Sequence, residues 1–207
     1  MTLDRSAVAA MFRSAAALLL ENEDHLSEID SRFGDGDHGI TIGKIARLIQ
    51  QRADAWQDES IQDFLDGLGM GIMEVKGGSA GPLYGTMIGG LGVELVPDEN
   101  ELSADSVRRM FAGALSEMQD ITTAKVGDKT MMDALIPAVK AAQDCPEDDP
   151  KAVLLAAAAA AQQGAKDSEG YVSKFGRARS YKEQTIGTPD AGAVSTALFI
   201  QGLAQGI

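Results

Sequence analysis

Apolar side chains recur every three or four residues along most of this 207-residue chain, the spacing that places them on one face of an α-helix. The first case is clear, because Val8, Met11, Phe12, Ala15 and Leu19 share such a face. The same spacing predicts eight helices, near residues 4–23, 37–49, 61–72, 81–95, 103–118, 130–143, 152–161 and 190–207. No segment alternates apolar and polar residues between hairpin turns, so we expect no sheet. The pattern therefore predicts an all-α fold.

Composition agrees with close-packed helices in a single domain spanning residues 1–207. Apolar residues make up 44% of the chain but aromatic residues only 5%, so Ala, Leu, Ile, Val and Met must fill most of the core. A chain of this length buries a sizeable core without covalent staples. Its single cysteine, Cys145, excludes an internal disulfide.

The formal net charge of −13 narrows the classes of partner. A surface this acidic repels nucleic acids and anionic membranes, so we expect neither as a partner. The longest uncharged stretch, residues 77–93, is shorter than the roughly 20 residues of a membrane-spanning helix. No targeting segment stands out, which leaves a cytoplasmic location as the expectation. A phosphate-bearing ligand would need a divalent cation to invert the local charge.

One short run combines three carboxylates and an imidazole with interleaved glycines, in the order Asp30-Ser31-Arg32-Phe33-Gly34-Asp35-Gly36-Asp37-His38-Gly39. Hard cations such as Mg²⁺ prefer several carboxylate oxygens together with phosphate oxygens. We therefore interpret Asp30, Asp35 and Asp37 as a metal site. His38 would donate to a phosphate or cap the helix, because imidazole is a poor Mg²⁺ ligand. The alternative is an acidic surface turn, since Asp and Gly are common in turns.

A glycine-rich segment, residues 75–86, precedes or opens the fourth predicted helix. Pro82 suits the first turn of a helix, where its missing N–H costs nothing. The glycines before it expose backbone N–H groups at the positive end of the helix dipole, which receives phosphate. We therefore assign residues 77–79 mainly to a ligand. The later glycines repeat every four residues and favour close packing with another helix: Gly81, Gly85 and Gly89. The segment is not a Walker A loop, because no Gly-x-x-x-x-Gly-Lys-Ser/Thr occurs.

Turn residues again precede a helix at residues 127–133. Asp128 suits either an N-cap or a ligand role, and both alternatives stay open. Thr130 and Met131 could flank a base or sugar, although Met in a helix is more often a core residue. This segment alone is a weak indication of a site.

The irregular segment 170–189 is long for a compact domain, which is typical of a functional or disordered loop. It carries a conspicuous basic cluster in an acidic chain: Lys174, Arg177, Arg179 and Lys182. Arg suits bidentate phosphate contacts, and the alternative is a solvated basic loop. Asp190, directly after this segment, suits the N-cap of the last helix.

Taken in order, these segments resemble the nucleotide-binding L subunit of dihydroxyacetone kinase, the DhaL family. The resemblance implies an eight-helix antiparallel barrel with a nucleotide bound at one end. It implies that Asp30, Asp35 and Asp37 hold two Mg²⁺ ions. The nucleotide contacts that it implies are His38, Gly39, Thr41, Ser79, Ala80, Met131, Arg177, Asp190 and Gly192. Gly78, in the phosphate cradle, and Thr130, beside the base or sugar, complete the candidate nucleotide-binding set.

The implied activity is phosphoryl transfer from a Mg-nucleotide to dihydroxyacetone or a related small ketose, with Arg177 neutralising the developing charge alongside the three aspartates. In the family, the sugar is held as a hemiaminal on a histidine of a separate K subunit, so this chain would be half of an enzyme. Two phosphoryl sources stay open. Either ATP exchanges in each cycle, or ADP stays bound and is rephosphorylated by a phosphotransferase-system phosphocarrier. Whether the chain forms a homodimer also stays open.

The chain departs from the family pattern mainly in residues 179–184, where relatives tend to have Ser-Tyr-Leu-Gly-Glu-Arg. Asp190-Ala191-Gly192 also replaces the usual Asp-Pro-Gly. These departures motivate an alternative from another class, a nucleotide-loaded sensor or interaction subunit that no longer catalyses. The identity of the sugar does not follow from this sequence, because the resemblance places the sugar on the other subunit.

Overall fold

The computed structural model describes residues 2–207, which contain nine α-helices, and Met1 of the predicted domain lies outside them. The helices are α1 Arg5–Glu21, α2 Glu23–Ser31, α3 His38–Ala55, α4 Ile61–Met73, α5 Ala80–Val93, α6 Ala104–Ile121, α7 Met132–Asp144, α8 Pro150–Asp167 and α9 Ala191–Gln205. Two 3₁₀ helices, η1 Ser168–Gly170 and η2 Arg177–Thr185, and two short strands, β1 Leu3–Asp4 and β2 Glu101–Leu102, complete the elements. The all-α fold predicted from the sequence is confirmed.

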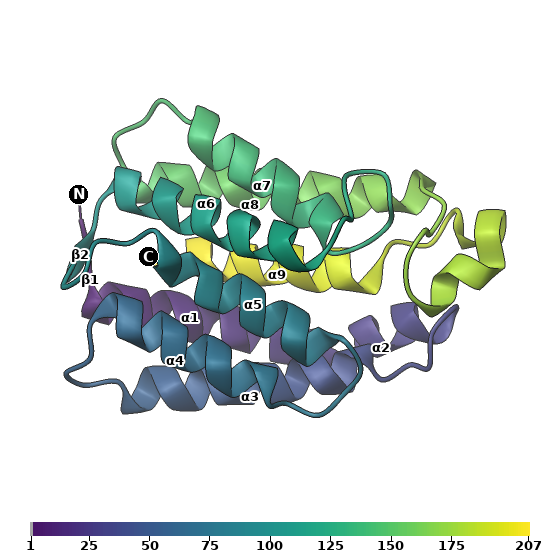
Figure 1. Cartoon of the computed structure of the whole chain (residues 1–207), viewed down its shortest axis with the longest axis horizontal. Coiled ribbons are helices and arrows are strands. Elements are labelled where there is room, and N and C mark those ends of the chain that lie inside the picture. The colour runs from purple at the N-terminus through teal and green to yellow at the C-terminus, as the bar shows by residue number, and fades with distance from the viewer. Residues whose placement is uncertain (1) are drawn as a thin grey trace.

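Eight of these helices form a closed ring in which each packs on the next along the chain, and α9 returns to α1 (Figure 1). Helix α2 extends the ring at one end, between α1 and α3. Apolar faces meet inside the ring, where Phe12 of α1 contacts the rings of Phe64 and Phe199 edge-on at centroid distances of 5.5 and 6.0 Å. These buried aromatic rings come from α1, α4 and α9, so they join neighbouring and distant parts of the chain.

Glycines bring α4 and α5 into close contact. A Cβ atom on Gly69 would lie 2.6 Å from the Cα of Gly89 and 2.8 Å from the carbonyl oxygen of Gly85. No side chain fits in so short a gap. The packing role predicted for Gly85 and Gly89 is therefore confirmed.

Two expectations from the sequence need correction. Helix α2 was not predicted, because only Leu26 and Ile29 are buried in its nine residues and the apolar repeat is too short to stand out. The expectation of no sheet fails for one pair of two-residue strands, in which Leu3 pairs with Leu102 and Asp4 with Glu101 in antiparallel register. Strands this short contain no visible alternation. None of the helices in residues 2–207 is long and apolar enough to cross a bilayer.

The connections between ring helices fall at two ends (Figure 1). One end carries both chain termini and the β1–β2 pair, with the connections 56–60, 94–103 and 145–149, and we call it the terminal end. The other carries α2 and the connections 32–37, 74–79, 122–131 and 168–190, and we call it the loop end. Helices α3, α5, α7 and α9 all begin at the loop end, so their N-termini converge there.

Candidate functional site

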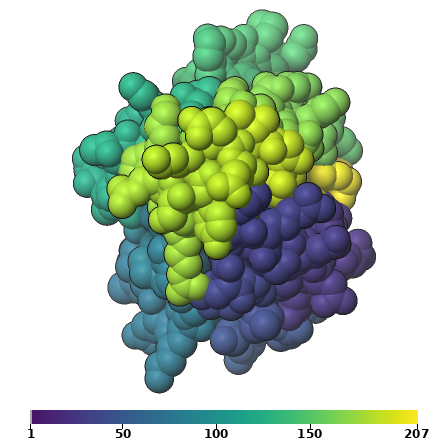
Figure 2. Space-filling model, turned by 90° about the vertical axis from the view of Figure 1, so that its right-hand side faces the viewer, coloured from purple at the N-terminus to yellow at the C-terminus, as the bar shows by residue number. Residues whose placement is uncertain are grey.

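The loop end contains a cavity of about 410 Å³, lined by residues from all four of its connections. Figure 2 views this face, where the yellow-green segment 168–190 lies across the surface beside the purple-blue segment around α2. Most of the site residues predicted from the sequence line the cavity: Asp30, Asp35, Asp37, His38, Thr41, Gly78, Ser79, Ala80, Thr130, Met131, Arg177, Asp190 and Gly192. Gly39 does not line it. Gly39 is buried against α2, where a Cβ would lie 2.0 Å from the carbonyl oxygen of Glu23.

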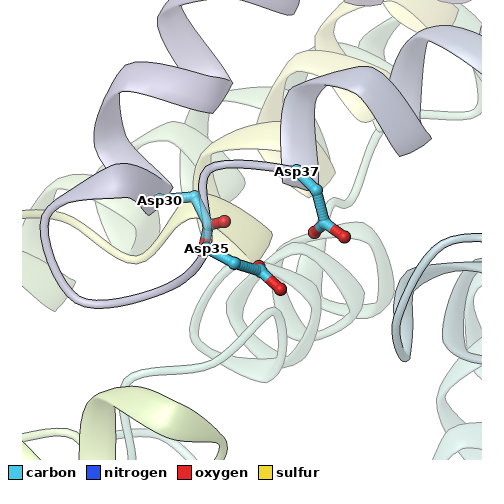
Figure 3. Close-up of side chains that lie close together, drawn as sticks. All are labelled: Asp30, Asp35 and Asp37. Carbon is cyan, nitrogen blue, oxygen red and sulfur yellow. The ribbon is translucent and has the colours of Figure 1, made fainter.

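Three carboxylates gather at one side of this cavity (Figure 3). Asp30 is on the last turn of α2, Asp35 is in the link to α3, and Asp37 directly precedes α3. Each offers an oxygen that lies within 4.8 Å of the others. The link can fold this tightly because Gly34 has no Cβ atom. A Cβ at this position would lie 2.2 Å from Oδ1 of Asp30. The local fold therefore brings three carboxylates that lie within eight positions of the sequence into one cluster.

The electrostatics of this cluster favour a cation. Burial and the nearby charges of Asp35 and Asp30 raise the pKa of Asp37 above its ordinary value. Burial also tends to raise the pKa of Asp35, but the ion pair with Arg177 holds that pKa below its ordinary value. Three carboxylate donors with an open side fit Mg²⁺, which keeps some ligand positions for water and phosphate oxygens. The residues present therefore fit the metal that the sequence predicts.

His38 is held by side chains that the sequence analysis did not identify. Its Nε2 lies 2.9 Å from Oγ of Ser195, and the buried hydroxyl of Tyr84 donates to the same Ser195 oxygen at 2.7 Å. Burial lowers the pKa of His38, although the nearby charge of Asp30 acts in the opposite direction. At neutral pH the ring is therefore an uncharged hydrogen-bonding group. Tyr84 and Ser195 are far from His38 in the sequence, so spacing gives no indication of the contact.

Of the three helices that begin at the cavity beside the carboxylates and the glycine-rich loop, only α5 starts without a side-chain acceptor, because the N–H of His38 in α3 donates to Asp30 at 3.4 Å and that of Met132 in α7 to Oγ1 of Thr130 at 3.2 Å. The residues that precede α3, α5 and α7 are Asp37, Ser79 and Met131, and none makes a side-chain hydrogen bond to its helix. The N–H groups in the first turn of α5 lie at the positive end of the helix dipole and suit an anionic ligand. Helix α9 differs, because the Asp190 carboxylate accepts from the N–H of Ala193 at 2.8 Å. The N-cap predicted for Asp190 is confirmed.

The carboxyl of Asp190 is unusual for an aspartate. Burial and the nearby charge of Asp133 raise its pKa to about 7, although the Ala193 hydrogen bond and the charge of Lys129 act in the opposite direction. Such a group gains or loses its charge near neutral pH. The charge that Asp190 contributes to the cavity wall therefore changes with pH near neutrality.

The connection 122–131 is ordered mainly by the carboxylate of Asp133, whereas the sequence drew attention to Asp128. Asp128 does not cap α7. It accepts instead from the N–H of Lys125 at 3.0 Å and forms an ion pair with Lys174 at 2.6 Å. Asp133 is fully buried and accepts from the N–H groups of Gly127 and Thr130, each at 2.6 Å. Asp133 therefore closes the turn in which Thr130 and Met131 face the cavity.

The segment 168–190 is tied to the rest of the site by cations. Arg177 pairs with Asp35 across the cavity, and Lys174 pairs with Asp128. Arg179 and Lys182 are exposed. Two of the four basic residues, Arg177 and Lys174, therefore bridge to other connections, with side chains that are 68% and 56% exposed.

Comparison with known proteins identifies the family. The DAK2 domain family matches residues 32–205 of this chain. A relative from Listeria innocua, the ADP-binding subunit DhaL of PEP-dependent dihydroxyacetone kinase 2, is 30% identical over all of this chain and 97% of its own length. The L-erythrulose kinase of Pectobacterium atrosepticum is 34% identical, over 95% of this chain and 34% of its own length.

Solved structures give the same result. The dihydroxyacetone kinase of C. freundii in its native form superimposes with a TM-score of 0.75 at 30% identity, covering 97% of this chain and 34% of that one. Its complex with AMP-PNP and Mg²⁺ gives a TM-score of 0.71 at 27% identity, with the same coverage. This chain thus spans nearly all of the Listeria subunit but about a third of the two longer kinases. The relatives are kinases or kinase subunits, as the sequence resemblance implied, and the chain belongs to the DAK2 domain family.

Proposed function

We propose that this chain is the nucleotide-binding, phosphoryl-transferring subunit of a kinase for dihydroxyacetone or a related small ketose. The observation that supports this proposal best is the joint arrangement at the loop end. A cluster of three carboxylates faces the same cavity as the N-terminus of α5, which has no side-chain cap. Carboxylates bind cations and uncapped N-termini bind anions, and a metal-bound polyphosphate combines both.

The aspartate cluster would hold Mg²⁺, and we propose two ions, as in the family resemblance. When bound, Mg²⁺ supplies positive charge that neutralises the phosphate oxygens. Asp30, Asp35 and Asp37 would hold that charge at the side of the cavity. The N–H groups at the start of α5 would bind phosphate oxygens, and Thr130 and Met131 would lie beside the base or sugar. Catalysis of this type depends mainly on positioning and charge neutralisation.

Arg177 would act at the transferring phosphoryl group. Its side chain is 68% exposed and pairs with Asp35, so it is held at the cavity yet free to exchange one anionic partner for another. A guanidinium matches the geometry of two phosphate oxygens. With the carboxylate of Asp35 engaged as a metal ligand, Arg177 would be available to the phosphate.

The names of the relatives support a divided enzyme. The Listeria relative is named as an ADP-binding subunit, and the complex of the C. freundii kinase contains AMP-PNP and Mg²⁺. We therefore propose ADP or ATP as the bound nucleotide and a separate K-type subunit as the carrier of the sugar. A phosphotransferase-system phosphocarrier is the proposed alternative to ATP, because the same relative is named as PEP-dependent.

Calorimetry of nucleotide binding tests the first part of the proposal. The wild-type chain should bind ADP in a Mg²⁺-dependent manner, and Asp37→Ala should lower that affinity at least 100-fold. Asp66→Ala is the matched control, because it removes the same charge from an exposed position on α4. Undiminished affinity in Asp37→Ala would contradict the metal assignment.

Reconstitution tests the second part. The chain is combined with a purified K-type subunit and dihydroxyacetone, first with ATP and then with ADP plus the phosphotransferase-system phosphocarrier. Formation of dihydroxyacetone phosphate in one arm identifies the phosphoryl source. Tight nucleotide binding without product in either arm supports the alternative, a nucleotide-loaded sensor with a diverged 179–184 segment.

A further inference from the structure

Lys129 is a buried cation whose contacts the proposed function does not explain. Its residue is 4% exposed and lies at the start of the turn that leads into α7. Its backbone φ of +61° is in the left-handed region, which residues with a side chain rarely adopt. A charged and conformationally unfavourable residue is retained only where its surroundings hold it in place.

The ammonium group of Lys129 donates to three backbone carbonyls. The acceptors are the oxygens of Thr188 at 2.5 Å, Ser168 at 2.6 Å and Tyr171 at 3.1 Å. A lysine ammonium has three N–H donors and no acceptor. All three donors are therefore in use, and none is left for a phosphate. Although Lys129 lines the cavity, its contacts are those of an anchor rather than of a ligand for the nucleotide.

The three acceptors lie at the two ends of one segment. Ser168 and Tyr171 begin the connection between α8 and α9, and Thr188 is near its end. Two more hydrogen bonds close the same neck, from the N–H of Gly187 to the oxygen of Glu169 at 2.7 Å and from the N–H of Asp190 to Oγ of Ser168 at 2.9 Å. Lys129 thus lies inside a ring of backbone that joins both ends of the segment.

Beyond this neck, the segment reaches the other side of the cavity. Arg177 pairs with Asp35, and the ring of Tyr181 packs on that of Phe33 with a centroid distance of 5.2 Å. Both of these contacts involve exposed side chains, since Arg177 is 68% and Tyr181 42% exposed. Exposed pairs of this kind contribute little to stability. A second anchor lies at Lys174, whose N–H donates to the carbonyl oxygen of Asp128 at 3.1 Å and whose ammonium pairs with the Asp128 carboxylate at 2.6 Å. The position of the segment over the cavity therefore depends on its buried neck together with this anchor.

We propose that Lys129 is a positioning residue that clamps the neck of segment 168–190 and thereby holds Arg177 and Asp190 over the nucleotide cavity. This inference rests on the proposed function for its consequence, nucleotide binding and transfer. The clamp itself is a property of the ligand-free chain. The two can therefore be tested separately.

Two variants remove the ammonium in different ways. Lys129→Met keeps most of the apolar side chain, and Lys129→Gly also relieves the left-handed backbone, so a folded variant is expected from at least one of them. Lys151→Met is the matched control. It makes the same charge change at a lysine that donates to the carbonyl oxygen of Ile207 at the terminal end.

Amide hydrogen exchange of the ligand-free proteins tests the clamp. Peptides covering residues 168–190 should exchange at least tenfold faster in the Lys129 variants, while peptides from α4 and α5 keep the wild-type rate. Lys151→Met should leave residues 168–190 unchanged. Unchanged exchange of residues 168–190 in the folded variants, or equal acceleration in α4 and α5, would overturn the proposal.

Rescue separates positioning from general damage. In a Cys145→Ala background, Lys129→Cys is aminoethylated in denaturant and refolded, which restores an ammonium through a thioether of nearly the same length as lysine. If aminoethylation restores slow amide exchange in residues 168–190, the clamp is supported. Ethylation of the same cysteine adds no charge, and slow exchange after ethylation would contradict the clamp. Where wild-type chain binds Mg-ADP, the Lys129 variants should lose at least tenfold in affinity or in kcat. Absence of binding in the wild type refutes the proposed function and leaves the exchange test standing.

Discussion

The terminal end and the loop end of the helix ring contain the ends of the same eight helices, but the helix N-termini at the two ends are capped differently. At the terminal end, α1, α4 and α6 begin with side-chain caps, in which Asp4, Ser60 and Ser103 accept from the N–H three residues ahead. Helix α8 begins there with Pro150, which has no N–H to satisfy. At the loop end, α3, α5 and α7 have no such caps. The clearest contrast is between α4, whose first turn is capped by Ser60 at the terminal end, and α5, whose first turn at the loop end has no side-chain acceptor and is left for a ligand.

The backbone shows the same contrast. Within residues 2–207, the terminal end has a single residue with positive φ, Asp98. The loop end has the others: Gly36, Gly77, Gly78, Gly127, Lys129, Gly176, Lys182 and Gly187. Six of these eight residues are glycines, which adopt positive φ readily and allow the tight turns that bring backbone close to a ligand. The difference indicates that the terminal end serves folding and the loop end serves binding.

The largest expected effect on nucleotide binding comes from placing a charge at the loop end. Ser79→Asp puts a carboxylate at the start of α5, where its charge should interact favourably with the helix dipole but repel the phosphates. A like charge at this distance is worth about 2–3 kcal/mol, which corresponds to a loss of roughly 100-fold in Mg-ADP affinity. Thermal unfolding should show equal or higher stability for the variant.

Ser79→Asn is the control for this change, because Asn caps helices without a charge. It should keep more of the affinity than Ser79→Asp does. Equal affinities for the two variants, measured by calorimetry, would mean that the start of α5 does not face the phosphates.

A smaller effect is expected from filling the space beside the glycine-rich loop. A Cβ on Gly77 would lie 2.1 Å from Oγ1 of Thr41, so Gly77→Ala should destabilise the fold by about 1–3 kcal/mol and displace the loop from the cavity. Gly71→Ala is the matched control within α4, because its Cβ would meet Leu48 at an ordinary 3.5 Å. It should stabilise the helix by about 0.5–1 kcal/mol. Chemical denaturation with calorimetry checks both, and equal stabilities would contradict the close approach.

The ring helices were predictable because each buries a long apolar face whose spacing is visible in the sequence. The carboxylate cluster was predictable for a similar reason, since Asp30, Asp35 and Asp37 lie within eight residues and are joined by glycines. Helix α2 was missed because it contributes only two buried side chains. Local pattern therefore predicts elements that are long or residues that are close in sequence.

The supporting residues of the site could not be predicted in this way. Ser195 contacts His38 across 157 positions of the chain, and Lys129 reaches the carbonyl of Thr188 across 59. Both contacts depend on how the connections at the loop end meet in space. The one local signal for Lys129 was a lysine within the turn Gly127-Asp128-Lys129-Thr130 of a strongly acidic chain.

The charge of Asp190 gives a pH-dependent prediction for the loop end. Its pKa is raised to about 7 in the folded chain from about 3.9 in an unfolded one. Between these values the folded state holds the extra proton, so this group lowers stability as pH rises from about 4 to 7 and has no further effect above 7. Asp190→Asn keeps a capping side chain but cannot ionise. Its stability relative to the wild type should therefore increase over this range, by about 4 kcal/mol for a difference of about three pKa units. Parallel stability curves from urea unfolding would contradict the raised pKa.

The smallest effects compare two serines that each precede a helix. Ser60 accepts from the N–H of Asp63 at 3.0 Å, whereas Ser79 makes no such bond to α5. Ser60→Ala should therefore destabilise the fold by about 1 kcal/mol and leave Mg-ADP affinity unchanged. Ser79→Ala should leave stability within about 0.5 kcal/mol but weaken Mg-ADP binding by about tenfold or less, the loss of one hydrogen bond. Equilibrium unfolding and calorimetry on both variants measure the four quantities. Because the two substitutions are chemically identical, a crossed result, in which Ser60→Ala weakens binding or Ser79→Ala destabilises the fold, would show that the two ends do not divide stability and binding as their caps indicate.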